Sequence, residues 1–148
     1  MNTQKLYNTP MEIAVRFLVI LERSKMKYDF DQLLYLDYFS LYSEDVKNNN
    51  YSNLHAPVPN RSLELYAREK MVSSIRSFLL SKGLIEIVAT EKGFKYQSSY
   101  KAPILFKYFD SEYYQEFTER VEETLRLFRT HTAIEMKSYF ENQIVESY

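Results

Sequence analysis

Residue types that could carry out catalysis or bind a metal are sparse in this 148-residue chain. Cysteine is absent, which excludes thiolate chemistry, disulfides and cysteine-based metal sites together. His55 and His131 lie in separate segments, so neither metal-ligand spacing nor a Ser–His–Asp arrangement emerges. Gly83 and Gly93 stand too far apart for a P-loop or a GxGxxG motif. The sequence therefore predicts a protein that is not an enzyme and has no cofactor.

Asp37 and His55 could act through a specific contact. Asp37 stands within an apolar run, where it either lies on an exposed strip or is held by a donor such as Arg61. His55 belongs to a loop and is most simply a surface residue, although Pro57 and Pro59 stiffen its surroundings and indicate an ordered loop end. We take Asp37, His55 and Arg61 as candidate partner-binding residues.

Charge is distributed unevenly along the chain. Counted from Lys, Arg, Asp and Glu, the net charge is −1 up to residue 60, +5 over residues 61–107 and −5 from residue 108 onward. A basic face suits phosphate groups. The candidate DNA contacts in the basic segment are Arg68, Arg76, Lys92 and Lys95. Packing of the basic segment against the acidic one would explain the same pattern without DNA.

The basic segment predicts one long helix, over residues 61–82, followed by a β-hairpin. Asn60 is placed as its N-cap and Gly83 as the left-handed residue that ends it. Its apolar stripe is Leu63, Ala67, Met71, Ser74, Ile75, Phe78 and Leu79. Residues 84–89 and 94–99 alternate as two strands around a glycine turn. Helix, glycine and hairpin follow the order of a winged-helix unit, which binds DNA or serves as a protein–protein adaptor.

Two helices and a long loop precede this unit. Thr9 is placed to cap a helix over residues 10–23, and Asp29 to cap a second, mostly apolar helix that runs to about residue 42. The inner face expected for the first helix is Ile13, Phe17, Ile20 and Leu21. The 18-residue loop over residues 43–60 replaces the tight turn of a plain helix-turn-helix, which argues against a simple DNA reader.

Behind the hairpin, residues 100–108 predict a short helical segment and residues 110–139 a long amphipathic helix. The long helix either packs on its own domain, or docks on a partner helix or a second copy. Its candidate partner-binding residues are Phe117, Val121 and Leu125.

The expected fold class is α+β, mainly α. Residues 1–109, with the long loop, form a modified winged-helix domain, and residues 110–148 form a C-terminal helix that packs on it or on a partner. There is no run of about 20 apolar residues for a membrane span and no apolar core of a secretion signal near Met1, so we expect a cytoplasmic protein.

Four short motifs carry a resemblance to a known family. They are Leu6-Tyr7-Asn8-Thr9-Pro10, Leu36-Asp37-Tyr38, the loop end Leu54-His55 with Pro59 and Arg61, and Ser81-Lys82-Gly83-Leu84. Over residues 6–128 the chain resembles the small middle component of bacterial ABC three-component systems, which are related to the Lamassu group of anti-phage defences.

This resemblance implies a non-catalytic subunit that bridges two partners, a coiled-coil ATPase similar to SMC and Rad50 proteins and an effector that is commonly a nuclease. DNA contact would occur within that complex. Two alternatives remain open from the residues alone. One is a stand-alone winged-helix transcription regulator, and the other is a structural protein that self-associates through its C-terminal helix.

Overall fold

The computed structural model describes residues 8–145 and is mainly helical, with one two-stranded antiparallel sheet. Its helices are α2 (Pro10–Ser24), α3 (Phe30–Leu41), α4 (Arg61–Glu69), α5 (Val72–Ser81), α6 (Ala102–Phe106), α7 (Glu112–Phe128) and α8 (Ala133–Tyr139). The other elements are a 3-10 turn η1 (Ser43–Asp45), the strands β1 (Ile85–Thr90) and β2 (Gly93–Ser98), and a π-helical segment η2 (Phe140–Val145). The α+β, mainly α class predicted from the sequence is confirmed.

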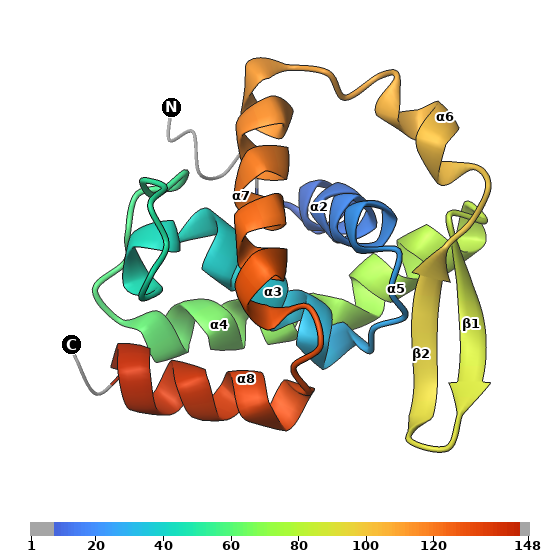
Figure 1. The fold of residues 1–148 in the computed structure, drawn as a ribbon. Coiled ribbons are helices and arrows are strands. Elements are labelled where there is room, and N and C mark those ends of the chain that lie inside the picture. Colours follow the sequence, from blue (N-terminus) through green and yellow to red (C-terminus); the bar gives the residue numbers. More distant parts are fainter. Residues whose placement is uncertain (1–7, 146–148) are drawn as a thin grey trace.

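Helices α2 and α3 form the centre of the molecule, and α7 crosses them on one side (Figure 1). The α2 helix begins as predicted, because the Thr9 side chain accepts a hydrogen bond from the Glu12 amide at 3.2 Å. The four residues predicted for its inner face are fully buried. The α3 helix begins at its predicted cap Asp29, which forms a capping box with Gln32, and Asp31 is the one exposed residue of this helix.

The helix predicted over residues 61–82 is in fact two helices. A turn at Lys70 and Met71 separates α4 from α5. On either side of the turn, α4 packs against α3 and η2, and α5 packs against α2 and β1.

The predicted apolar stripe of this segment is right in α5, except at the exposed Ser74, and wrong in α4. Ile75 and Leu79 are fully buried, as expected. In α4, however, Leu63 and Ala67 face solvent, and the buried side chains are Leu65 and Arg68. The stripe that packs inward therefore runs through a charged residue.

The predicted hairpin is confirmed, with strands paired from Ile85 opposite Ser98 to Thr90 opposite Gly93. Gly83 has φ +66° and Gly93 φ +104°, so both sit in the left-handed region that glycine tolerates best. The chain between α2 and α3 adds one bridge to β2, with hydrogen bonds between the backbones of Tyr28 and Tyr96 at 2.8 and 3.0 Å.

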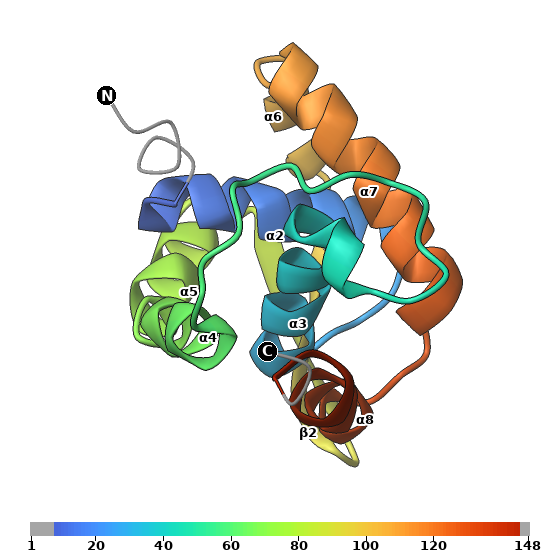
Figure 2. The same cartoon turned by 90° about the vertical axis from the view of Figure 1, so that its left-hand side faces the viewer.

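The loop over residues 43–60 begins with η1 and then runs across one face of the molecule to α4 (Figure 2). The Leu54 amide donates to the Leu41 carbonyl at 2.9 Å, which holds the loop on the end of α3. Arg120 of α7 donates to the Ser52 carbonyl at 2.9 Å. The ordered loop end that the prolines predicted is therefore present.

The helix predicted over residues 110–139 is also divided, into α7 and α8. Thr132 and Glu135 form a capping box that starts α8 as a new helix. This allows α8 to turn back and pack against α3. The predicted boundary between residues 109 and 110 falls between α6 and α7, and residues on both sides of it contribute to one hydrophobic cluster. Within the described residues, no helix is long and apolar enough to cross a bilayer.

Candidate functional site

A buried group of charged side chains around Asp37 is the most distinctive polar feature of the molecule. Arg16 donates to both carboxylate oxygens of Asp37, from Nε at 2.8 Å and from Nη2 at 3.2 Å. Arg68 donates from Nη1 to Oδ2 of Asp37 at 2.6 Å. All three side chains are at most 2% exposed. We call this group, together with Asn8, His55, Glu64 and Tyr113 around it, the Asp37 cluster.

The outer members of the Asp37 cluster bring in chain segments far apart in the sequence. The Asn8 amide oxygen accepts from Arg16 at 3.2 Å, and Glu64 accepts from Arg68 at 2.9 Å. The Tyr113 hydroxyl accepts from Arg16 at 3.3 Å and lies 2.7 Å from Nε2 of His55. The cluster thereby joins the start of the described chain, α2, α3, the long loop, α4 and the first turn of α7.

Charge in the cluster is balanced, because two guanidinium groups face two carboxylates. Burial alone would lower the pKa of Arg16, but the charge of Asp37 and its hydrogen bonds outweigh burial and raise that pKa. Burial, with the neighbouring charges of Arg16 and Arg68, lowers the pKa of His55 to about 3. His55 is therefore neutral at neutral pH and adds no third positive charge.

The chemistry available to this cluster is structural. Burial raises the pKa of Tyr113 to about 12, so its hydroxyl stays protonated over the range in which proteins function. His55 stays neutral over the same range, and Asp37 is enclosed by two arginines. The arrangement fixes these segments of chain in one geometry, as a buried polar network does when its members are hydrogen-bonded.

Of the two alternatives for Asp37, a buried position with a specific donor is the correct one, but the donor is not Arg61. Asp37 is held by Arg16 and Arg68, whereas Arg61 pairs with Asp45 at 3.2 Å. The missed signal was Arg16, which lies on the inner face of α2 beside Phe17. A charged residue on an apolar stripe requires a partner, and Asp37 is the opposite charge on the other central helix.

The residues predicted to bind partners have internal positions in this chain. Phe117, Val121 and Leu125 are at most 1% exposed, on the helix α7 that packs against α2 and α3. These three side chains therefore pack on the chain's own helices. His55 is 5% exposed, so it is not the surface residue that its loop position suggested. The outer face of α7 is instead acidic, with exposed Glu112, Glu116, Glu119 and Glu122.

The four predicted DNA contacts are not equivalent in the structure. Arg68 is buried in the Asp37 cluster, where it pairs with Asp37 and presents no exposed charge to DNA. The Arg76 guanidinium lies 5.8 Å from the ring centroid of Phe30, and Lys95 donates to Gln32 at 3.3 Å. Lys92, at the hairpin turn, is exposed.

The described part of the chain shows neither a metal site nor a membrane-spanning helix. Across residues 8–145, no three side chains of His, Cys, Asp or Glu come together in a way that could hold a metal ion. The distinctive features are thus an enclosed charge cluster, an ordered loop and a hairpin.

Comparison with known proteins gives one family. The profile of the family described as ABC-three component (ABC-3C) system Middle Component 2 matches residues 6–148. A search of the curated proteins finds no match, and neither does a search of the solved structures. The matched range includes every helix and strand described above, together with all seven members of the Asp37 cluster. The chain therefore belongs to the Middle Component 2 family of ABC-three component systems.

Proposed function

We propose that this chain is a non-catalytic adaptor subunit that bridges an SMC/Rad50-like coiled-coil ATPase and an effector, commonly a nuclease, in an anti-phage defence complex. The observation that carries the proposal is the family match over residues 6–148, because a middle component is by description one part of a three-component system. The ATPase, the effector and the link to Lamassu systems are the further content of the proposal.

The geometry supports an adaptor more readily than an enzyme. The strongest polar constellation, the Asp37 cluster, has its charges paired with one another and enclosed by helices. A substrate-binding site needs polar groups that face a concave, accessible surface. The cluster instead stiffens the junction between α2, α3, α4, α7 and the long loop. A rigid junction suits a subunit that holds two partner proteins at fixed positions relative to each other.

The fold of residues 10–98 supports assignment as a modified winged helix. The order of elements is α2, a bridge at Tyr28, α3, the pair α4 and α5, and then the hairpin. The bridge places the Tyr28 segment beside β2, where a winged helix has its additional short strand. The long loop between α3 and α4 is the departure from the simple form, and its contacts with α7 tie it to the rest of the chain.

The alternative, a stand-alone DNA-binding regulator, is less well supported. One of its four expected basic contacts, Arg68, is buried. Lys92 and Lys95 remain on the hairpin, so DNA contact by the wing inside a complex is compatible with the structure.

Affinity purification from the native host tests the adaptor proposal. A tagged chain should recover a large ATPase with a long coiled coil and a second protein of effector type, in fixed ratio. Recovery of the chain alone, under gentle lysis and low salt, would overturn the proposal. Recovery of chromosomal fragments without an ATPase would favour the regulator instead.

A further inference from the structure

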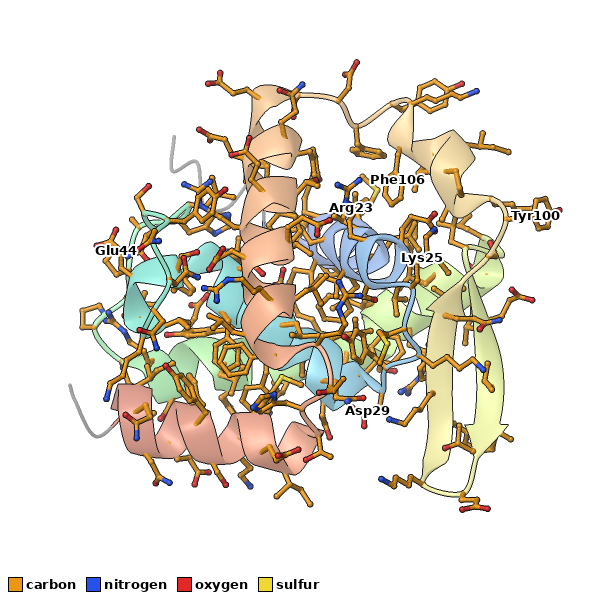
Figure 3. All side chains as sticks on the ribbon, in the orientation of Figure 1. Arg23, Lys25, Asp29, Glu44, Tyr100 and Phe106 are labelled. Carbon is orange, nitrogen blue, oxygen red and sulfur yellow. The ribbon has the colours of Figure 1, made fainter. Side chains whose placement is uncertain are left out.

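A hollow where α3, α4 and α8 meet combines acidic and apolar walls. Its volume is about 280 Å³, and its lining includes Asp31 and Tyr35 of α3, Glu69 of α4, and Ile134 and Lys137 of α8. Figure 1 shows α8 passing below α3 and α4. Figure 3 shows Asp29, the cap of α3, beside the start of α8, where Gln32 donates to the His131 carbonyl at 3.0 Å. We call this feature the Tyr35 hollow.

The two acidic walls of the hollow have no ion pair with any residue that the structure describes. Asp31 and Glu69 are both exposed. Lys137, the one cation of the lining, lies 4.0 Å from Glu141 in the next turn of its own segment. Asp31 and Glu69 therefore leave the hollow with an excess of negative charge.

Tyr35 brings a third polar group to the same place. Its side chain is 7% exposed, and its ring packs against Phe39 and Phe140 with centroids 6.1 and 5.9 Å away. Its hydroxyl makes no hydrogen bond with residues 8–145, although the hydroxyl of a buried tyrosine usually finds a partner. Burial first, and then the charges of Glu69, Asp31 and Glu141, raise the pKa of Tyr35 to about 12, so the hydroxyl is protonated and both carboxylates act on it.

We propose that the Tyr35 hollow receives an arginine side chain from another component of the three-component system, an inference that rests on the function proposed above. A guanidinium group has five N–H donors in a planar fork, so one arginine can donate to Asp31, Glu69 and the Tyr35 hydroxyl together. The apolar wall at Ile134 suits the hydrocarbon stem of that side chain.

Other occupants match the hollow less well. Its acidic walls repel the phosphates of nucleic acid. Its volume of about 280 Å³ lies below the range of roughly 300–1,000 Å³ that is typical of small-molecule pockets. One long basic side chain fits both its size and its charge, and arginine is enriched among the residues that dominate binding energy at interfaces.

The hollow is tested with the tagged chain co-expressed with the ATPase and effector of its own system. D31N/E69Q keeps the shape of both side chains and removes both charges, so the partner should bind roughly 10-fold or more weakly, as expected when charge-assisted hydrogen bonds to a central arginine are lost. The matched control is E86Q/D110N, which removes two exposed carboxylates elsewhere on the surface and should bind as the native chain does.

Tyr35→Phe separates binding from folding, because it removes the hydroxyl and keeps the buried ring. The hydroxyl has no partner among the described residues, so the free energy of unfolding in urea should stay unchanged. The partner should nevertheless bind about 3-fold more weakly, the usual effect of losing one hydrogen bond. A large loss of stability with native binding would show that the hydroxyl acts inside the chain and would overturn the inference.

A photo-reactive amino acid at position 134, on the rim, identifies the occupant. A crosslink to an arginine-containing segment of the ATPase or the effector supports the inference, and replacing that arginine by alanine should weaken binding of the native chain but not of D31N/E69Q. A crosslink to a second copy or to nucleic acid overturns it. If the native chain assembles and both hollow variants assemble equally well, the arginine site is wrong and the adaptor function stands. If the native chain is recovered alone, both proposals fail.

Discussion

At the scale of single residues, the molecule is organised by charge placed where apolar side chains would be expected. Arg16, Asp37 and Arg68 occupy the inner faces of three helices, and each is at most 2% exposed. Burying charge in this way is favourable only when partners and hydrogen bonds replace the lost water. The Asp37 cluster meets that condition through its seven members, and it fixes which helix faces meet.

Replacing Asp37 by asparagine tests this role. Two buried guanidinium groups would lose their shared counter-charge, and we expect the free energy of unfolding to fall by about 3–5 kcal/mol. Urea denaturation followed by circular dichroism measures the change. The matched control is Asp31→Asn in the exposed first turn of the same helix, expected to cost less than about 1 kcal/mol. Equal costs for the two substitutions would show that the cluster does not stabilise the fold.

His55 predicts a pH dependence of stability. Its pKa is lowered from 6.5 to about 3, first by burial and then by Arg16 and Arg68, so between these values only the unfolded chain binds the proton. Its contribution is therefore complete above about pH 6.5 and decreases by about 1.4 kcal/mol per pH unit as pH falls toward 3. Between pH 7 and 5.5, the native chain should lose about 1 kcal/mol more than His55→Gln does. Identical pH profiles for the two proteins would contradict this.

At the scale of elements, the sequence pattern locates the capped starts of α2, α3 and α4 but not the start of α8. Thr9, Asp29 and Asn60 were identified and are N-caps in the structure. The capping box of Thr132 and Glu135 was present in the sequence but was read as part of a continuous helix. The amphipathic pattern over residues 110–139 favours one continuous helix, but the capping box at Thr132 ends that pattern and begins α8.

Removing the Thr132 cap should weaken α8 in particular. Thr132→Ala is expected to cost about 1 kcal/mol, the usual loss when an N-cap side chain is replaced by alanine. Amide hydrogen exchange at Met136, whose N–H bonds to the Thr132 carbonyl at 3.0 Å, should speed up accordingly. The neighbouring exposed Thr130→Ala is the control and should leave that amide unchanged. Equal exchange in both variants would mean that the cap does not define α8.

The parts of the site that the sequence did not predict depend on tertiary contacts. Periodicity indicated that α2 has an inner face, but it could not show that Arg16 of that face meets Asp37, 21 residues away. In α4, two stripes with helical spacing were available, and the fold buries the one that contains Leu65 and Arg68. The packing of α4 against α3 decides between them. No short-range signal encodes that choice.

At the scale of the whole molecule, one hydrophobic cluster links α2 and α3 with α7, α8 and the hairpin, and the long loop lies across it. Two regions of the described surface differ in character, the acidic outer face of α7 and the exposed hairpin turn. Such a division suits a subunit that presents separate surfaces to separate partners.

DNA binding by the isolated chain should be weak and non-specific. Of the four predicted DNA contacts, Arg68 is buried, Arg76 and Lys95 are half-buried and Lys92 is exposed, so we expect Kd values within roughly 10⁻⁴–10⁻⁶ M, the usual non-specific range. Fluorescence anisotropy with duplex DNA over a salt series measures this. K92A/K95A should reduce the salt slope by about 2, because each lysine removed leaves about one phosphate without a protein cation. Tight, sequence-specific binding by the chain alone would favour the regulator.

The most direct test of the adaptor function is to assemble the system with and without this chain. The ATPase and effector of the same system are co-expressed with and without this chain, and the masses of the purified assemblies are determined by light scattering. Bridging predicts that the ATPase and effector co-elute only when the chain is present, in an assembly whose mass includes all three. Stable association of the ATPase with the effector in the absence of the chain would contradict the proposed role.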